Sequence, residues 1–485
     1  MASPASAARR YDVSILAGSY VGWMGLKSGL ETVMIDPVPD YSGVSYPLSS
    51  KQTRFTKAGG VHSVSSKQAA LQSRAWLVIL LNAFYSVADA LCSVFVSVYF
   101  YVNSLDVTLV FQHYTTLYIT TPIAFIVAGW YAKTKDHTHV FRIGLLLHAG
   151  YYALLLYLRT DAVRYVIPLG AFFGVTWGFF WAGNNIFQFD FSAGGKSREY
   201  FLGLISSVSN GAKMVAPFIS GAIIRSSSTP ERGYHLVFFL ALIAYLASVA
   251  VSFYIPHINS RRPFHIRKAL LPDKEQHDWR LVMLASASLA GSFHIFHFLL
   301  AILMYRHVAN EAAVGGYVSF QGLVIVVTAF FVGKYAMPYL RPRFMFWGVI
   351  TLVIAGAVLS CKITVATMLV FALLRSISLP LFGIPHTAIR FEVMRRAVEE
   401  PSERIEYICA WEVPLAIGRI IMMSAVMLLY HYADEAGLRT AVLLLCCIRI
   451  ATYLLVKRVS FVKQPELADG EEFPVFHSDM GQTGS

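Results

Sequence analysis

The chain has 485 residues, of which 56% are hydrophobic and only 14% are charged, whereas soluble globular domains contain about 25% charged residues. Its net charge of +12 lies mostly between long apolar stretches and not on a compact basic surface. This composition excludes an ordinary soluble enzyme and a nucleic-acid partner, and it predicts a protein of the lipid bilayer.

Residues 1–74 precede the first long apolar stretch. The short apolar run 15–24 is interrupted by Gly18 and Gly22, and no compact apolar core with a cleavage site follows the basic start. A secretory signal peptide is therefore not expected. We predict a largely disordered cytosolic segment that could contact a protein partner.

Twelve apolar stretches follow, each near the length of about 20 helical residues that crosses a bilayer. The stretches of the first half are 76–102, 108–132, 141–158, 165–187, 201–224 and 235–255; those of the second half are 281–304, 312–333, 344–361, 364–387, 405–429 and 438–456. We predict an all-α polytopic fold with two six-helix bundles, 75–255 and 281–458. A basic cytosolic linker, 256–280, joins the bundles, and an acidic cytosolic tail, 459–485, follows them.

The positive charges are distributed unequally between the two sides of these stretches. One side carries 24 Lys and Arg residues, including those of the linker, and the other carries 7. Because short cytosolic loops are enriched in Lys and Arg, both termini are predicted to be cytosolic. The plasma membrane is favoured over an organelle membrane. The cysteines lie in or beside apolar stretches and are interpreted as packing residues: Cys92, Cys361, Cys409, Cys446 and Cys447.

A short pattern repeats between the two halves. The second stretch ends in Gly129-Trp130-Tyr131-Ala132 and the eighth in Gly333-Lys334-Tyr335-Ala336, 204 residues later. Gly144 and Gly348 are separated by the same 204 residues. Parallel repeats of six helices are one of the known plans of membrane transporters. The pattern therefore indicates an internal duplication.

Over residues 76–458 the chain resembles the major facilitator superfamily, on the basis of the six-plus-six helices, the basic linker and the repeated glycine. The family has a glycine, an acidic residue four positions later, and then basic residues after its second helix; here Lys133 stands where the acid is expected, and Met337 stands there in the second half. The resemblance implies a secondary carrier that works by alternating access. The gating candidates are Gly129, Lys133, Asp136, Arg142, Gly333, Arg341, Pro217 and Pro380.

Ionisable residues at membrane depth cost about 2.5–3.5 kcal/mol each, so they are candidates for function. Asp89 lies near the middle of the first stretch. Its carboxylate can exchange a proton, which makes it the leading candidate for proton coupling, with Glu412 and His294 as further candidates. A structural ion pair with a cation of another helix is the alternative for Asp89.

Three central cations, Lys213, Arg375 and Arg419, are the leading substrate-binding candidates. Lys213 and Arg419 occupy matching depths of the fifth and eleventh stretches, so they are predicted to face one cavity from opposite halves. Arg and Lys side chains suit carboxylate or phosphate groups, which favours an anionic substrate. Arg419 could instead pair with Glu412, seven residues earlier on the same helix face. Arg449 is assigned to packing, because the twelfth helix of the family commonly lies outside the cavity.

Polar and aromatic residues complete the predicted site. Trp181, Asn184 and Asn185 end the fourth stretch, and such a surface suits an organic ligand with an apolar body. His297 follows His294 by three residues, but no acidic cluster accompanies the pair, so no metal site is expected.

The sequence has no nucleotide-binding glycine loop and no nucleophile motif, so neither an enzyme nor a cofactor is expected. We predict a secondary active transporter of a small organic solute, anionic and proton-coupled. Its partners are then the substrate, protons and the lipid bilayer. The alternative is a non-transporting scaffold or assembly factor with the same fold, since fold alone does not fix function.

Overall fold

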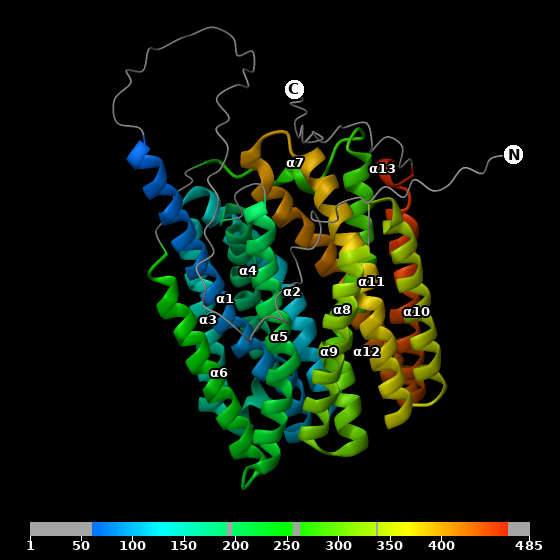
Figure 1. Cartoon of the computed structure of the whole chain (residues 1–485). Coiled ribbons are helices and arrows are strands. Elements are labelled where there is room, and N and C mark those ends of the chain that lie inside the picture. The colour runs from blue at the N-terminus through cyan, green and yellow to red at the C-terminus, as the bar shows by residue number, and fades with distance from the viewer. Residues whose placement is uncertain (1–60, 192–195, 256–261, 336–337, 464–485) are drawn as a thin grey trace, which may run out of the picture.

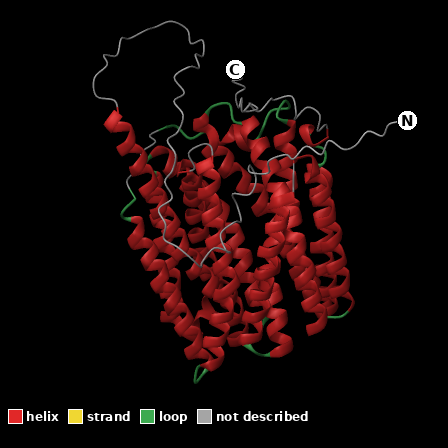
Figure 2. Ribbon diagram, in the orientation of Figure 1, coloured by secondary structure: helices red, strands yellow, loops and turns green. Residues whose placement is uncertain are grey.

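The computed structural model describes residues 61–191, 196–255, 262–335 and 338–463. Within these ranges the chain is helical, with short turns and no β-strand (Figure 2). The helices of the first half are α1 (Val61–Ser104), α2 (Val107–Thr134), α3 (His137–Leu158), α4 (Val166–Phe191), α5 (Lys196–Ser226) and α6 (Pro230–Ser252). After these come α7 (Ile266–Leu270), α8 (His277–Val308), α9 (Glu311–Tyr335), α10 (Arg341–Cys361), α11 (Val365–Ala397), α12 (Arg404–Val456) and α13 (Ser460–Lys463). Three 3₁₀ helices are η2 (Arg159–Tyr165), η3 (Pro338–Leu340) and η4 (Pro401–Glu403).

Eight helical stretches of the described residues are long and apolar enough to cross a membrane. One of these stretches includes both α3 and α4, and another is the whole of α12. Each of the twelve predicted apolar stretches lies within a helix to within three residues, and α12 holds the last two of them. The backbone of α12 leaves helical conformation at Ala433 and Asp434, where φ of Asp434 is 44°. The chain reverses direction at this break. After the reversal Gly437 lies against Leu429, where a Cβ on the glycine would be only 1.8 Å from the Leu429 carbonyl oxygen.

The helices extend beyond the predicted stretches at several ends. α1 begins at Val61, so the last part of the segment 1–74, predicted to be largely disordered, is helical; residues 1–60 lie outside the described residues. The second half of this extension, 67–74, consists mostly of Lys, Gln, Ala, Leu and Arg, which are good helix formers. α7 lies within the predicted linker and α13 within the predicted tail. Apolar periodicity locates only the membrane part of a helix, which is why these ends were not predicted.

The helix contacts divide into two groups, as Figure 1 shows. α1 to α6 pack with one another, and α8 to α12 pack with one another. The two groups meet mainly through α5 with α9, α2 with α12, and α1 with α8. A shift of 204 residues relates α2 to α9 and α5 to the first part of α12, so the first two of these pairs are equivalent in the duplicated chain.

The start of α1, the end of α12 and α7 lie at one end of the molecule, here called the linker end (Figure 1). The opposite end, here called the far end, carries the turns that follow α1 and α8. These turns contain Leu105, with φ of 54°, and Ala309, with φ of 48°. The two residues are 204 positions apart, so the duplication is visible in the backbone as well as in the sequence.

The repeated glycines mark equivalent helix contacts. A Cβ on Gly144 would lie 2.5 Å from the backbone nitrogen of Phe180, and one on Gly348 would lie 2.9 Å from that of Phe382. Thus α3 packs against α4 as α10 packs against α11, and in both cases only glycine allows the approach.

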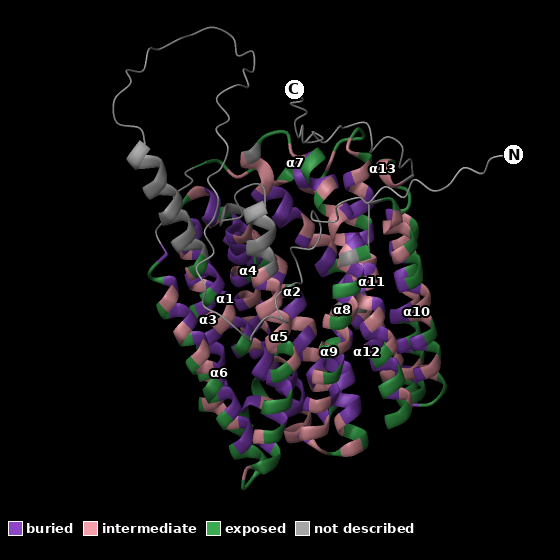
Figure 3. Cartoon of the chain, viewed as in Figure 1, coloured by how far each residue is buried: buried purple, intermediate pink, exposed green. Residues whose placement is uncertain are grey.

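Buried residues fill the centre of the structure, and exposed residues lie along its outer faces (Figure 3). Many of the exposed residues are large and apolar, among them Ile123, Phe218, Trp347 and Leu428. A soluble protein does not expose apolar side chains over so many helix faces, whereas a lipid-facing surface requires it.

Candidate functional site

Asp89 lies half-buried near the middle of the membrane part of α1. The cation that acts on its carboxylate is Lys213 of α5, which attracts it electrostatically. The Lys213 side chain is exposed although it lies in mid-helix, and it makes no hydrogen bond or close ion pair with a described residue. Lys213 is therefore a cation with an ammonium group that remains available to another partner.

Two residues of the second half complete this group. Arg375 of α11 is only 7% exposed, and its Nη1 donates a hydrogen bond to Oε1 of Gln321 in α9 at 3.1 Å. Its guanidinium lies over the Phe296 ring of α8, 5.4 Å from the ring centre. His297 of α8 is within electrostatic range of both Lys213 and Arg375. We call Asp89, Lys213, His297 and Arg375 the central charge cluster.

A second group surrounds Arg419 of α12. Arg419 and Glu412 are both buried, and Nη1 of Arg419 lies 2.7 Å from Oε1 of Glu412. The pairing considered as an alternative from the sequence is therefore present. The guanidinium of Arg419 also lies over the ring of Tyr118 in α2, 5.7 Å from its centre. His294 of α8 contacts the ring of Tyr118 edge-on, with 6.3 Å between the ring centres.

Trp177 of α4 closes this second group from the other side. Its ring lies edge-on to His294, with 6.3 Å between the ring centres. We call Trp177, Tyr118, His294 and Arg419 the four-helix subsite, since α4, α2, α8 and α12 each contribute one residue. Its buried Trp177 Nε1 and Arg419 Nε have no hydrogen-bond acceptor among the described residues.

Sequence reasoning did not select Tyr118 or Gln321 for the site. Trp177 begins the aromatic and amide run 177–185 that the sequence suggested for an organic ligand, and it precedes Trp181 by one helical turn. Tyr118 and Gln321 carry no charge and stand in ordinary apolar stretches, so their sequence offers no comparable signal.

The remaining substrate-binding candidates lie apart from these contacts. Trp181 is 37% exposed and packs edge-on against Phe180. Asn184 is buried, and its Oδ1 has no hydrogen-bond partner among the described residues, while Asn185 is half-buried. Arg449 is buried against the Phe382 ring, 4.8 Å from its centre, which agrees with the packing role assigned to it.

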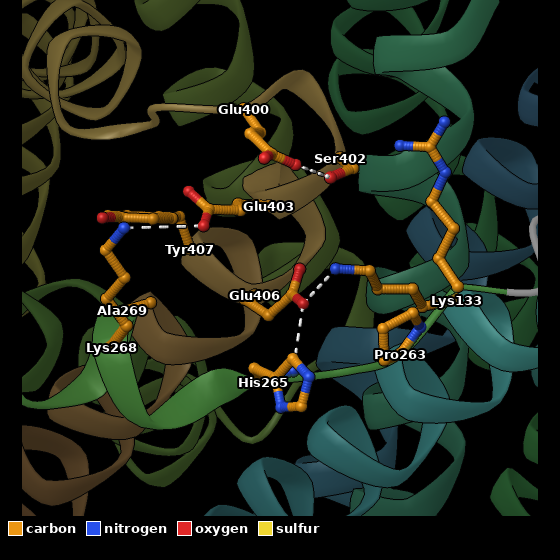
Figure 4. Close-up of a pocket in the computed structure, with 11 residues that line it drawn as sticks. Lys133, Pro263, His265, Lys268, Ala269, Glu400, Ser402, Glu403, Glu406 and Tyr407 are labelled. Atoms are coloured by element: carbon orange, nitrogen blue, oxygen red, sulfur yellow. Dashed lines mark hydrogen bonds and ion pairs between the residues drawn. The ribbon is translucent and has the colours of Figure 1, made fainter.

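At the linker end, Lys133 of α2 forms an ion pair with Glu406 of α12, and both side chains are buried (Figure 4). The backbone N–H of His265 donates to Oε1 of Glu406 at 3.1 Å, and that of Arg262 donates to the Lys133 carbonyl oxygen at 3.0 Å. The linker therefore binds both members of the pair. These residues line a cavity of about 240 Å³. Lys133, which occupies the position of an acid in the family pattern, thus has an acidic partner in the other half.

Lys268 of α7 strengthens the same end. Its Nζ lies 2.7 Å from Oε2 of Glu399 and 3.6 Å from Oε1 of Glu403. The hydrogen bond that the Lys268 ammonium donates to Glu399 raises the pKa of Lys268 above its usual value. Because this pKa is raised, the contact is fully present below the ordinary lysine pKa of about 10.4 and is lost only as the pH rises beyond it. Neutral pH therefore leaves the contact intact.

Two glycine contacts bring the halves together. A Cβ on Gly129 of α2 would lie 2.2 Å from Sγ of Cys409 in α12. Three glycines lie between α5 and α9. A Cβ on Gly221 would lie 2.4 Å from the Glu311 carbonyl oxygen, and one on Gly315 would lie 2.2 Å from the Pro217 carbonyl oxygen. A Cβ on Gly322 would lie 3.0 Å from the Lys213 carbonyl oxygen. We call this second contact the glycine seam; it runs from the far end to the depth of Lys213.

The predicted gating residues are accordingly divided. Gly129, Lys133 and Pro217 lie at contacts between the halves. Asp136 instead caps α3 by accepting a hydrogen bond from the Thr138 N–H at 2.6 Å, and Arg142 donates to the Ser252 carbonyl oxygen at 3.0 Å within the first group. Gly333 lies near the end of α9, Arg341 begins α10 and Pro380 is buried within α11.

No family model matches the chain. It is 30% identical over 162 residues to an uncharacterized protein in the sodM 3′ region of Geobacillus stearothermophilus, covering 33% of this chain and 75% of that protein. It is 25% identical over 385 residues to the uncharacterized protein YqgE of Bacillus subtilis, covering 79% of this chain and 89% of that protein.

Solved structures of membrane transporters share the fold. The peptide transporter POT in complex with sulfate matches with a TM-score of 0.60 at 12% identity, over 80% of this chain and 95% of that chain. The fucose:proton symporter FucP of E. coli matches with a TM-score of 0.56 at 14% identity, over 80% of this chain and 98% of that chain. At these identities the likeness concerns the fold and not the substrate.

Proposed function

Since the chain belongs to one family with the Geobacillus protein and has the major facilitator superfamily fold, we propose that it is a secondary active carrier of a small organic anion, coupled to protons and working by alternating access. The proposal includes twelve membrane-spanning helices in two six-helix bundles, 75–255 and 281–458. It also places the linker end and both termini in the cytosol, because the linker end carries the excess of Lys and Arg.

The observation that carries the anion is the unequal charge of the central charge cluster. The cluster holds two cations, Lys213 and Arg375, and one carboxylate, that of Asp89. Arg375 is buried and donates its hydrogen bond to the neutral Gln321, and a cation removed from water is costly unless a counter-charge accompanies it. A bound carboxylate or phosphate would supply that counter-charge, whereas a scaffold would gain nothing from retaining the surplus. This favours transport over the scaffold alternative.

Proton coupling follows from competition for Lys213. When Asp89 is ionised, its carboxylate attracts the ammonium of Lys213 and competes with a substrate anion for it. Protonation of Asp89 removes this competitor and leaves the ammonium to the substrate. Binding of the anion and of the proton therefore favour each other, which is the linkage that a symporter requires. The fucose:proton symporter has the same fold, which supports but does not establish this assignment.

Alternating access requires a closure at each end of the site. The pair of Lys133 and Glu406, with the linker bound to it, is the proposed closure at the linker end. The glycine seam, together with the stacked rings of Tyr114 and Phe298, 4.0 Å apart, is the proposed closure toward the far end. Both closures join residues of different halves, so each would be broken by a rocking motion of the bundles.

Anion binding can be tested on purified protein with a library of organic anions, by thermal shift and then by calorimetry. We expect Lys213→Ala and Arg375→Ala each to weaken binding of the best anion by about 1–3 kcal/mol, the range of a lost charged hydrogen bond. Arg164→Ala is the matched control, because Arg164 is exposed and pairs with Asp161 outside the site. Unchanged affinity in both cluster variants would contradict the anion site. Absence of any ligand together with a copurifying partner would favour the scaffold.

The closure at the linker end can be tested by the reactivity of Cys409, which is buried beneath Gly129. With the other four cysteines replaced by serine, Glu406→Gln is expected to raise the rate of maleimide labelling at least about tenfold, since about 1.4 kcal/mol of closure corresponds to that factor. Glu392→Gln is the control, because Glu392 pairs with Arg395 and Arg396 on its own helix. The double variant Lys133→Glu, Glu406→Lys should label slowly again. Fast labelling of this double variant would refute the pair as a closure.

A further inference from the structure

The four-helix subsite contains two buried hydrogen-bond donors that the protein itself does not use. These are the indole Nε1–H of Trp177 and the guanidinium Nε–H of Arg419, neither of which has an acceptor among the described residues. Buried donors in native proteins are almost always paired with protein, water or ligand. The two donors come from different halves, α4 and α12. The Trp177 ring lies edge-on to His294, and the Arg419 guanidinium lies over the Tyr118 ring, which also contacts His294 edge-on.

The charge of this subsite differs from that of the central charge cluster. Glu412 lies 2.7 Å from Arg419 and neutralises it, so no counter-charge is missing. An additional carboxylate or phosphate would there meet the Glu412 carboxylate without a free cation to compensate it. The unused donors therefore call for an uncharged oxygen acceptor, and the aromatic faces of Tyr118 and Trp177 would enclose the apolar atoms next to it.

We infer that the four-helix subsite binds a neutral oxygen acceptor of the transported molecule, a carbonyl, hydroxyl or ether oxygen, while the central charge cluster binds its anionic group. The inference rests on the proposed function and narrows its substrate class to organic anions with a second, uncharged acceptor. Because Trp177 and Arg419 belong to different halves, the acceptor would join the two bundles when the substrate is bound. A monocarboxylate without such an acceptor would engage only the cluster.

The test uses the full-length purified protein and pairs of probes that differ only in one ketone: pentanoate with 4-oxopentanoate, and hexanoate with 5-oxohexanoate. Affinities are measured by calorimetry. In the wild type, at least one oxo acid is expected to bind about tenfold more tightly than its parent acid. In Trp177→Phe, which keeps an aromatic ring but removes the N–H, this advantage should fall to about twofold or less. Trp181→Phe, at the exposed tryptophan one turn later, should retain it.

The possible outcomes separate this inference from the proposed function. If parent and oxo acids bind equally in the wild type, or if Trp177→Phe keeps the full advantage, a water molecule occupies the donors and the subsite is refuted, while the anion carrier stands. If no acid of the series binds although other organic anions do, the substrate class inferred here is wrong while the anion carrier stands. If no organic anion binds at all, the proposed anion site is itself wrong and the subsite fails with it. The melting temperature of unliganded Trp177→Phe, close to that of the wild type, verifies that the variant is folded.

Discussion

Replacing Asp89 by Asn is expected to abolish proton-driven accumulation of the substrate while leaving counterflow exchange measurable. Asn has nearly the shape of a protonated Asp but cannot release a proton, so the coupling step is lost. Lys213 is then permanently free of its competing carboxylate, and anion affinity should be retained or increased. The measurement is uptake into proteoliposomes with and without an imposed pH gradient, compared with exchange at equal pH on both sides.

Asp161→Asn is the control for this experiment, because Asp161 is exposed and pairs only with Arg164. Normal accumulation by a well-expressed Asp89→Asn variant would rule out the coupling role. If Asp89 is instead a structural partner of Lys213, the variant should be poorly expressed, and Lys213→Met should restore its abundance. The structural role thus predicts that Lys213→Met restores the abundance of the Asp89→Asn variant, whereas the coupling role predicts an Asp89→Asn variant with no loss of abundance to restore.

Replacing Glu412 by Gln is expected to reduce protein abundance and the apparent melting temperature strongly. Arg419 would lose its 2.7 Å partner while remaining buried. Removing one member of a buried ion pair typically costs about 3–5 kcal/mol, because the other charge is left uncompensated. Abundance in membranes and thermal stability in detergent are the readouts.

The double variant Glu412→Gln, Arg419→Met should recover most of this loss, since no charge then remains buried without a partner. Glu435→Gln is the matched control on the same helix: Glu435 pairs with Arg439 at 2.8 Å, but both are exposed, and such pairs contribute about 0–1 kcal/mol. Equal stability of Glu412→Gln and wild type would show that Arg419 finds water or another partner.

The sequence predicted the helices because apolar length is a strong signal, and it located the cations because charges are rare at membrane depth. It also identified Gly144 and Gly348 as equivalent, because their spacing of 204 residues can be read without knowing which helix each one contacts. In the structure they pack on Phe180 and Phe382. The extent of α1 before residue 75 was not predicted, because it does not depend on apolar periodicity. The break within α12 at Ala433 and Asp434 falls between the last two predicted stretches, 405–429 and 438–456.

The partners of the candidate residues could not be predicted in the same way. Glu406 is 273 residues from Lys133, and neither residue carries a signal that names the other. Tyr118 approaches Arg419, and Trp177 approaches His294, only because two halves of the chain pack together. Arg419 was the exception, because its partner Glu412 lies on its own helix at a spacing that can be read directly.

The glycine seam has a mechanical consequence. Where Gly322 and Gly315 lie against the backbone of α5, the two helices approach closely because no Cβ stands between them. Such surfaces allow small shear displacements, in which the helices slide along each other before the rocking motion separates them. By contrast, the Cys409 side chain occupies the space over Gly129, so α2 and α12 must separate before they can move along each other. The two contacts between the halves therefore differ: the glycine seam allows α5 and α9 to slide, whereas the contact of Gly129 with Cys409 does not allow α2 and α12 to do so. The glycine seam ends beside Lys213.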